Sequence, residues 1–304
     1  MQVLIAVDGS EGSFEAVRQI GPLLLPERDE VALYCHPPQL LDRSGQATSQ
    51  TLESARESMA NAIFAEARKR LPSEFRKVST IIGQQDPKRG IIIAAEQFSA
   101  GLVVMGARGL GPFQRLVLGS VSQTVVHACR IPVWVARRKP GELPWGSRVL
   151  LAHSKPEANK PSMDLLSQLH WPENTLSTFL SVIPSMFAGN IPEWMQQQAR
   201  ESYVDSSGQR WAEEHEEDVR EHLVQLRSYA GNLPTPFNRA RCSVVEGDPA
   251  REILATIARE STDLAVIGAQ GNRPLIGAWL GSTANAVLNH AECSVLVVPS
   301  PESP

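Results

Sequence analysis

Two segments of the chain contain the residue types that bind phosphate. Both have the spacing Gly-x2-Gly-x9-Gly-Ser, and they lie 162 residues apart. The first consists of Gly106, Gly109, Gly119 and Ser120, and the second of Gly268, Gly271, Gly281 and Ser282. Each follows a short apolar run and precedes a helical pattern. Because the first N–H groups of a helix lack intrahelical partners and the helix dipole attracts anions, each segment predicts a phosphate site.

The spacing belongs to a longer internal repeat. Asp86-Pro87 and Asp248-Pro249 are also 162 residues apart, and each pair predicts a helix start with a capping aspartate and a proline in the first turn. The first strands, 3–10 and 149–156, correspond at an offset of 146, so the second half carries 162 − 146 = 16 additional residues before its Asp-Pro pair. A repeat of this length predicts two domains, 1–138 and 147–300, joined by a polar linker.

Each half alternates strand and helix patterns. Residues 3–7 and 31–35 are continuous apolar runs, which is typical of strands covered on both faces. The alternation predicts an α/β fold with a mostly parallel sheet and helices on both faces. The helices between the strands are expected to bury one face each. These faces are Phe14, Val17, Ile20 and Leu24 in the first helix, and Leu52, Ala55, Met59, Ala62 and Ile63 in the second.

In such sheets, ligands bind at the carboxyl ends of the strands, where the strand order reverses. With strands one and four at that point, Asp8 at the end of the first strand and Gly106 at the end of the fourth would face the same crevice. Asp8 has two interpretations, a contact with a bound nucleotide or a cap for the helix that follows it.

Composition bounds the class of protein. The chain has 304 residues and 42% hydrophobic content, which suffices for two cores. We expect a cytoplasmic protein without membrane insertion, because we find no membrane-spanning apolar run and no secretory signal pattern at the N-terminus. The four cysteines, Cys35, Cys129, Cys242 and Cys293, form no CxxC pair and are expected to be buried and reduced.

Charge is distributed unevenly between the halves. Residues 1–140 contain 17 basic and 13 acidic side chains (+4), whereas residues 141–304 contain 12 and 20 (−8). Segment 190–222 contributes nine acids and three arginines and is expected to be an acidic helical insertion. Val219, Leu223, Leu226 and Ala230 continue it at helical spacing, which predicts a long amphipathic helix. We interpret the acids as a solvated face, with a partner or dimer contact as the alternative, and we expect no nucleic-acid binding.

The segments VLIAVDGSEGS (3–13) and LVVMGARGLGPFQRLVLGSVSQTVVHACRIPVWV (102–135) resemble the universal stress protein family. The resemblance covers nearly the whole chain, twice. It implies two open five-stranded parallel sheets of a flavodoxin/Rossmann-like kind, similar to adenine nucleotide alpha hydrolases and related by pseudo-twofold symmetry. It also implies an intramolecular pseudo-dimer through the last strands, 133–136 and 295–298, and a stress-response regulator rather than an efficient enzyme.

The glycine-serine spacing is similar to the family's ATP-binding motif. The resemblance implies ATP, with Mg2+ held by the phosphates and not by protein side chains. In the first half, the residues that match the family's nucleotide site are Asp8, Cys35, Met105, Gly106, Arg108, Gly109, Gly119, Ser120, Val121 and Ser122. In the family, the equivalent of Asp8 lies near the nucleoside, the segment matching Tyr34–His36 contacts adenine, and the helix start matching Gly119–Val121 holds the β- and γ-phosphates.

The second half departs from this pattern. Its candidate residues are Gly268, Gly271, Gly281, Ser282 and Thr283. Ser154 stands where the first half has Asp8, Gln270 replaces Arg108 and Gly277 replaces Arg115. We therefore expect nucleotide binding there to be weaker than in the first half, or absent.

Three functions stay open at this point. The first is a nucleotide-binding regulator, the second a nucleotide-independent scaffold that uses the acidic helix, and the third a slow ATPase. The chain has no GxxxxGK[ST] loop and no GxSxG elbow after a strand, which argues against a P-loop NTPase and a serine hydrolase. A protein partner of unknown identity and a further homodimer also stay open.

Overall fold

The computed structural model describes residues 1–38, 49–75, 77–108, 118–137, 148–153, 160–183, 194, 206–269 and 280–299. The linker was predicted near 137–146, and its residues from 138 on lie outside the described ranges. Both glycine loops (109–117 and 270–279) and most of the segment 184–205 also lie outside them. The predicted domain boundaries therefore stay predictions.

The first half alternates strands and helices as the sequence indicates. Its strands are β1 (Gln2–Ala6), β2 (Glu30–Cys35), β3 (Val78–Ile82), β4 (Leu102–Gly106) and β5 (Val133–Ala136). Its helices are α1 (Glu11–Ile20), η1 (Gly21–Leu23), α2 (Ser49–Arg68), α3 (Pro87–Gln97) and α4 (Ser120–Ala128). The side chains of β1, β2 and β4 are almost all buried, because helices cover both faces of these strands.

The second half repeats the order with one long helix. Its strands are β6 (Arg148–His153), β7 (Leu176–Ile183), β8 (Arg241–Glu246), β9 (Leu264–Gly268) and β10 (Ser294–Val298). Its helices are α5 (Lys160–Leu166), α7 (Ser206–Gly231), η3 (Phe237–Arg239), α8 (Pro249–Glu260) and α9 (Ser282–His290). The predicted Asp-Pro helix starts are confirmed, since the Asp86 side chain caps α3 and the Asp248 side chain caps α8.

All ten strands form one sheet in the order β3-β2-β1-β4-β5-β10-β9-β6-β7-β8. Pairing is parallel within each half, and the halves meet where β5 and β10 pair antiparallel, with Trp134 opposite Leu296. The predicted pairing of the last strands is thus confirmed. β1 and β4 are direct neighbours in the first half, as β6 and β9 are in the second, so each half has its strand-order reversal at that pair.

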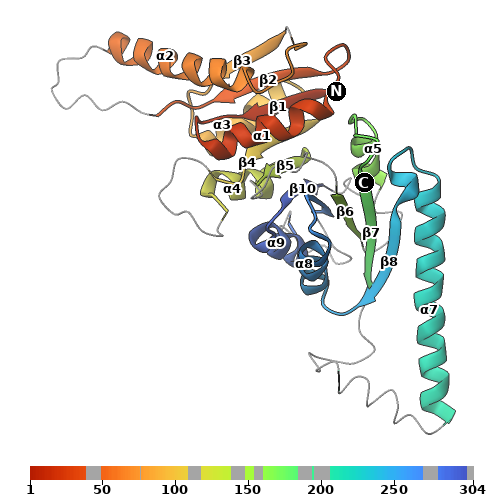
Figure 1. The fold of residues 1–304 in the computed structure, drawn as a ribbon. Helices are drawn as coiled ribbons and strands as arrows, with labels where there is room; N and C mark the ends of the chain where they lie inside the picture. The colour runs from red at the N-terminus through yellow and green to blue at the C-terminus, as the bar shows by residue number, and fades with distance from the viewer. Residues whose placement is uncertain are drawn as a thin grey trace.

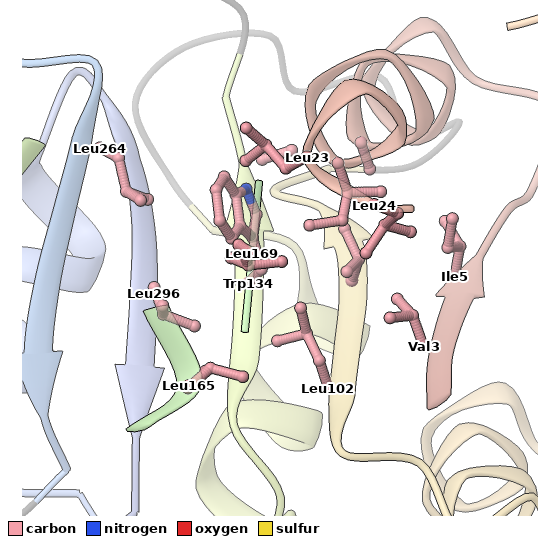
Figure 2. Packing of buried hydrophobic residues seen from close by; sticks show 14 of the residues in the cluster. Val3, Ile5, Leu23, Leu24, Leu102, Trp134, Leu165, Leu169, Leu264 and Leu296 are labelled. Carbon is pink, nitrogen blue, oxygen red and sulfur yellow. The ribbon is translucent and has the colours of Figure 1, made fainter. Parts of the chain in front are cut away.

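The two faces of the sheet have separate cores. Alternate strand residues pack against α1, α2, α5 and α7 on one face and against α3, α4, α8 and α9 on the other. Figure 2 shows the first of these cores near the junction of the halves, where Trp134 of β5 and Leu296 of β10 belong to one cluster with Leu165 and Leu169. Because this core runs across the antiparallel junction, the halves share buried apolar surface as well as a strand pair.

The predicted face of the first helix is confirmed, since Phe14, Val17, Ile20 and Leu24 are all buried. The predicted face of α2 is wrong. Met59 is 37% exposed, whereas α2 buries Ala60, Phe64 and Ala67. Alanines lie on several sides of this helix, so hydrophobic spacing alone did not select the side on which Phe64 contacts the sheet.

The predicted amphipathic helix is α7. Its Leu226 and Ala230 are buried and Val219 and Leu223 are half-buried, which confirms the predicted face. Only the C-terminal part of α7 packs into the core, and the helix runs alongside β8 at the outer edge of the sheet (Figure 1). The acids described between 213 and 221 are exposed, consistent with a solvated face.

Candidate functional site

A tight turn connects β1 to α1 and holds Asp8. Asp8 Oδ1 accepts hydrogen bonds from the Ser10 backbone N–H at 2.9 Å and from the Ser10 hydroxyl at 2.6 Å. Ser10, and not Asp8, is the residue that caps α1, because its Oγ accepts from the Ser13 N–H. Gly9 has φ +85°, which favours glycine in this turn. Asp8 therefore orients the capping residue through one oxygen, and among the described residues its other oxygen has no hydrogen-bond partner.

The start of α1 packs directly on the end of β4. A Cβ at Gly106 would lie 2.6 Å from the Gly12 carbonyl carbon, and a Cβ at Gly12 would lie 2.7 Å from the Arg108 carbonyl oxygen. The Ser10 hydroxyl also reaches the Arg108 carbonyl, at 3.4 Å. Gly106 is therefore required for backbone packing whether or not a ligand binds there. Sequence reasoning missed Gly12, although a glycine in the first turn of a helix after DGS is a signal of close backbone approach.

The start of α4 completes the crevice on the other side of β4. The Gly119 N–H donates to the Ala107 carbonyl at 2.8 Å, and the Ser122 hydroxyl, which is buried, donates to the Gly106 carbonyl at 2.8 Å. Ser120 is exposed and Val121 half-buried. The Ser122 hydroxyl is therefore used to fix α4 on β4, and Ser120 is the exposed residue of this helix start.

Two kinds of helix start occur among the helices whose capping residue the structure describes. Side chains cap α1, α3 and α8, whereas α4 and α9 begin after Gly119 and Gly281 with no side-chain cap. Neither of these two helices has an acidic residue in its first turn. The described glycine-serine motifs thus leave their helix N-termini open to an anion, while the capped helices do not.

The second copy reproduces this geometry. The Gly281 N–H donates to the Ala269 carbonyl at 2.6 Å, and Gly281 has nearly the same dihedral angles as Gly119. Ser282 is exposed and Thr283 half-buried, like their counterparts. Ala284 stands where the first half has Ser122, so the hydroxyl tether is missing. Gly271, Gln270 and Ser154 lie outside the described residues, as does Gly109 in the first half.

Two of the predicted contacts have buried side chains. Cys35 and Met105 are 0% and 4% exposed, so only their backbone is available to a ligand. Burial, with a smaller contribution from the Asp8 charge, raises the pKa of the Cys35 thiol to about 12. His36 follows Cys35 and is half-buried, and its Nδ1 atom is buried without a hydrogen-bond partner. Cys35 at the end of β2 is therefore a buried neighbour of Asp8.

The cysteines are all free, as predicted. Cys35, Cys129 and Cys293 are buried, but Cys242 is only half-buried, so the expectation of burial is wrong for that residue. β8 is the edge strand of the sheet, which leaves its side chains with cover on fewer sides. Among the described residues, no helix is long and apolar enough to cross a membrane, and no three His, Cys, Asp or Glu side chains converge as a metal site would require.

Arg137 is a site neighbour that the sequence did not indicate, since it was assigned to the linker. It directly follows β5, and burial lowers the pKa of its guanidinium, as does the nearby charge of Arg108 to a smaller extent. Its Nη2 donates to the Leu288 carbonyl in the second half, and its Nη1 is buried without a partner. Two guanidinium groups therefore lie within electrostatic range of each other at the carboxyl ends of β4 and β5.

Comparisons with known proteins agree with this architecture. A family model described as "Universal stress protein family" matches residues 1–137 and 190–299. A universal stress protein of Mycolicibacterium smegmatis is 26% identical over 234 residues, covering 73% of this chain and 68% of the relative. One from Mycobacterium tuberculosis is 34% identical over 87 residues, or 27% of this chain and 28% of that protein. The crystal structure of a universal stress protein from Archaeoglobus fulgidus superimposes with a TM-score of 0.62 at 17% identity, covering 99% of this chain and 97% of that one.

Proposed function

The chain belongs to the universal stress protein family, and from that premise we propose that its first half binds an adenine nucleotide, with ATP as the principal ligand. The nucleotide occupies the crevice between the carboxyl ends of β1 and β4. The observation that carries the proposal is the contrast among helix starts, because α4 begins at Gly119–Ser120 without a side-chain cap while α1 and α3 are capped.

Each part of the crevice suits a different part of the ligand. The backbone N–H groups of Ser120 and Val121 receive the β- and γ-phosphates, since the Gly119 N–H already donates to the Ala107 carbonyl, and the charges of Arg108 and Arg137 favour these anions. Asp8 is a carboxylate that accepts and does not donate, so it suits ribose hydroxyls and would repel phosphate. A divalent cation such as Mg2+ would be held by the phosphates, since no cluster of protein ligands is present among the described residues.

The proposed role is regulatory. ATP bound at the first half stabilises one conformation of the protein, and a protein partner reads that state. No described pair of side chains near the α4 start combines a nucleophile with a positioned base, so efficient hydrolysis is not part of the proposal. The second half retains the helix geometry but has Ala284 in place of Ser122 and, by sequence, no acid in place of Asp8. It binds nucleotide more weakly or serves to complete the pseudo-dimer.

Calorimetric titration of the full chain with ATP and Mg2+ tests the proposal. The protein is first denatured and checked by mass spectrometry for copurified nucleotide. We expect saturable binding of one ATP per chain at the stronger site. A universal stress protein has been solved in complex with cAMP, so cAMP is titrated in parallel.

The absence of heat at millimolar ATP, on ligand-free protein, would contradict a nucleotide-binding role. That outcome would favour the competing hypothesis, in which the exposed acidic face of α7 acts as a nucleotide-independent scaffold. Steady phosphate release that depends on Ser120 would instead support the slow ATPase.

A further inference from the structure

A cavity of about 580 Å3 opens at the amino ends of the second half's strands, at the ends opposite to that half's own glycine-serine motif. It is bounded by the first residues of β6, β7 and β8 and by the ends of η3 and α8. These strands are neighbours at the outer edge of the second half (Figure 1). β6 has six residues, so the cavity lies roughly 20 Å from the carboxyl ends of the second half's strands, where that half has its glycine-serine motif. A volume of this size is in the range that holds a small organic ligand.

Positive charge dominates the lining. Four arginines line the cavity, namely Arg148, Arg239, Arg241 and Arg259. Two carboxylates of the described part of the chain, Glu173 and Glu260, line it with them, so the formal balance of these residues is 4 − 2 = +2. The surrounding half of the chain has a formal charge of −8 (12 basic against 20 acidic side chains). A basic hollow in an acidic half focuses anions into one place.

The two carboxylates do not occupy all of the guanidinium N–H donors in the cavity. Arg241 and Arg259 approach the Glu260 carboxylate only at 3.8 and 4.0 Å, and Arg148 donates at 3.1 Å to the Glu260 backbone carbonyl instead. Arg239 has no ion pair among the described residues and is exposed. The Glu260 carboxylate also accepts a hydrogen bond from the Thr178 hydroxyl at 2.8 Å, so part of its hydrogen-bonding capacity is not directed to the arginines. Each guanidinium has five N–H donors, and several of them remain for a ligand.

A buried hydroxyl provides an independent sign of a ligand. Thr175 lines the cavity, is 6% exposed, and its Oγ1 has no hydrogen-bond partner. An unpaired buried hydroxyl carries a desolvation cost of about 1–3 kcal/mol, which a bound acceptor would remove. Ser177, also buried, makes only a long hydrogen bond of 3.5 Å to the Pro236 carbonyl. Hydroxyl and guanidinium donors together suit phosphate oxygens, which are numerous acceptors with a high charge.

The duplicated fold supplies an internal comparison. Where Arg148 begins β6 and pairs with Leu176, Gln2 begins β1 and pairs with Glu30. There the Gln2 amide donates to the Glu30 carboxylate at 3.2 Å, and the neighbouring buried charge is Asp29. The first half therefore builds the same sheet edge with a glutamine, two acids and two cations, Arg28 and the Met1 ammonium, which both pair with Asp29. The arginine cluster is a property of the second half and is not a requirement of the shared fold.

We propose that this basic cavity, defined by Arg148, Thr175, Arg239, Arg241 and Arg259, binds a small phosphorylated metabolite at a site separate from the nucleotide crevice. The ligand carries at least two phosphate charges, which offset the surplus of guanidinium groups. The site is independent of the proposed nucleotide function, because it is built by strands of the second half, and β5, β10 and β9 lie between β4 and β6 in the sheet.

The test uses inorganic pyrophosphate as the probe and calorimetry on the full chain, at constant ionic strength set with sodium chloride. The titration is made in a Ser120→Glu/Ser282→Glu background, so that the starts of α4 and α9 already repel phosphate. We expect one saturable site. The pair Arg239→Ser/Arg241→Ser should weaken it by about tenfold or more. The matched pair Arg220→Ser/Arg251→Ser makes the same charge change at exposed arginines outside the cavity and should leave affinity unchanged.

Thr175→Val separates binding from folding. It removes the unpartnered hydroxyl, so the unfolding midpoint should stay the same or rise while pyrophosphate affinity falls severalfold. The proposal is overturned if pyrophosphate gives no saturable heat, if both arginine pairs weaken binding equally, or if citrate binds and pyrophosphate does not. The last result would identify a polycarboxylate site in place of a phosphate site.

Discussion

The Ser294 hydroxyl donates a hydrogen bond to Gln19 Oε1 at 2.8 Å, although the two residues are 275 positions apart. Both side chains are buried, at 1% and 3% exposure. The same Gln19 oxygen accepts from the Trp134 indole at 3.3 Å, and Gln19 Nε2 donates to the Arg137 carbonyl at 2.9 Å. One glutamine on α1 therefore joins β5 of the first half to β10 of the second, beside the antiparallel junction.

Gln19→Leu should lower the free energy of unfolding by about 3 kcal/mol, because it leaves the Ser294 hydroxyl, the Trp134 N–H and the Arg137 carbonyl without this partner in a buried setting. Urea denaturation of the full chain measures the change. Gln97→Leu is the control, since Gln97 is exposed at the end of α3, and it should change stability by no more than about 0.5 kcal/mol. Equal losses in the two variants would mean that the buried network does not join the halves.

Asp29 should make stability depend on pH in the acid range. Burial of its carboxyl acts to raise the pKa, but hydrogen bonds from Arg28 at 3.0 Å and from the Leu25 N–H at 2.8 Å outweigh that effect and lower the pKa. Between the folded pKa and the ordinary value of about 3.9, the unfolded chain binds more protons than the folded one. The stabilisation is therefore complete above the ordinary pKa and is lost as the pH falls through the folded pKa.

Asp29→Asn should cost about 1–3 kcal/mol at pH 7 and should flatten the fall in stability below about pH 4. Urea titrations at a series of pH values test both parts. Glu27→Gln serves as control, because Glu27 is exposed beside the same turn and should change little. An unaltered pH profile in the Asp29 variant would show that this carboxyl does not contribute to acid sensitivity.

Gly106→Ala should destabilise the protein by about 2 kcal/mol or more, because the new methyl group would lie 2.6 Å from the backbone of Gly12, where nothing flexible can move away. Nucleotide binding should fall with it, since α1 and β4 would separate at the crevice. Gly101→Ala is the matched control, as its Cβ would meet nothing closer than 3.7 Å. Thermal unfolding measures the midpoints of the two variants. Equal midpoints would disprove the close packing of Gly106 on Gly12.

Much of the fold was predictable because parallel strands leave a strong pattern. β1, β2 and β4 are covered on both faces, so their apolar runs are nearly unbroken, and the repeat at 162 residues revealed the second half. The buried face of α2 was not predictable from spacing, because several alanines made more than one face equally apolar. The junction through Gln19 and Ser294 was also hidden, since nothing local in the sequence relates residues 275 positions apart.

The location of the candidate site was predictable from the sequence. Which of its residues pack the fold and which are available to a ligand was not predictable. The motif located α4 and α9 correctly at the ends of β4 and β9. It did not reveal that Gly106 is needed to pack on Gly12, or that the Ser122 hydroxyl is used internally. A glycine required by a neighbouring backbone and a glycine required by a ligand look the same in one sequence. Arg137 was missed because a basic residue after the last strand reads as a linker.

Ser120→Glu and Ser282→Glu distinguish the two copies of the motif. Both serines are exposed first residues of uncapped helices. A carboxylate there interacts favourably with the helix dipole and should stabilise each helix by about 0.3–1 kcal/mol, so loss of binding cannot be ascribed to unfolding. The same carboxylate would occupy the place of a phosphate and repel it. In calorimetry, Ser120→Glu should abolish the stronger ATP site, while Ser282→Glu should leave it intact. The nucleotide does not lie on α4 if ATP binds equally well to the Ser120 variant, or if only the Ser282 variant loses ATP binding. In either case Asp8, Arg108 and Arg137 around the first crevice would serve the fold alone.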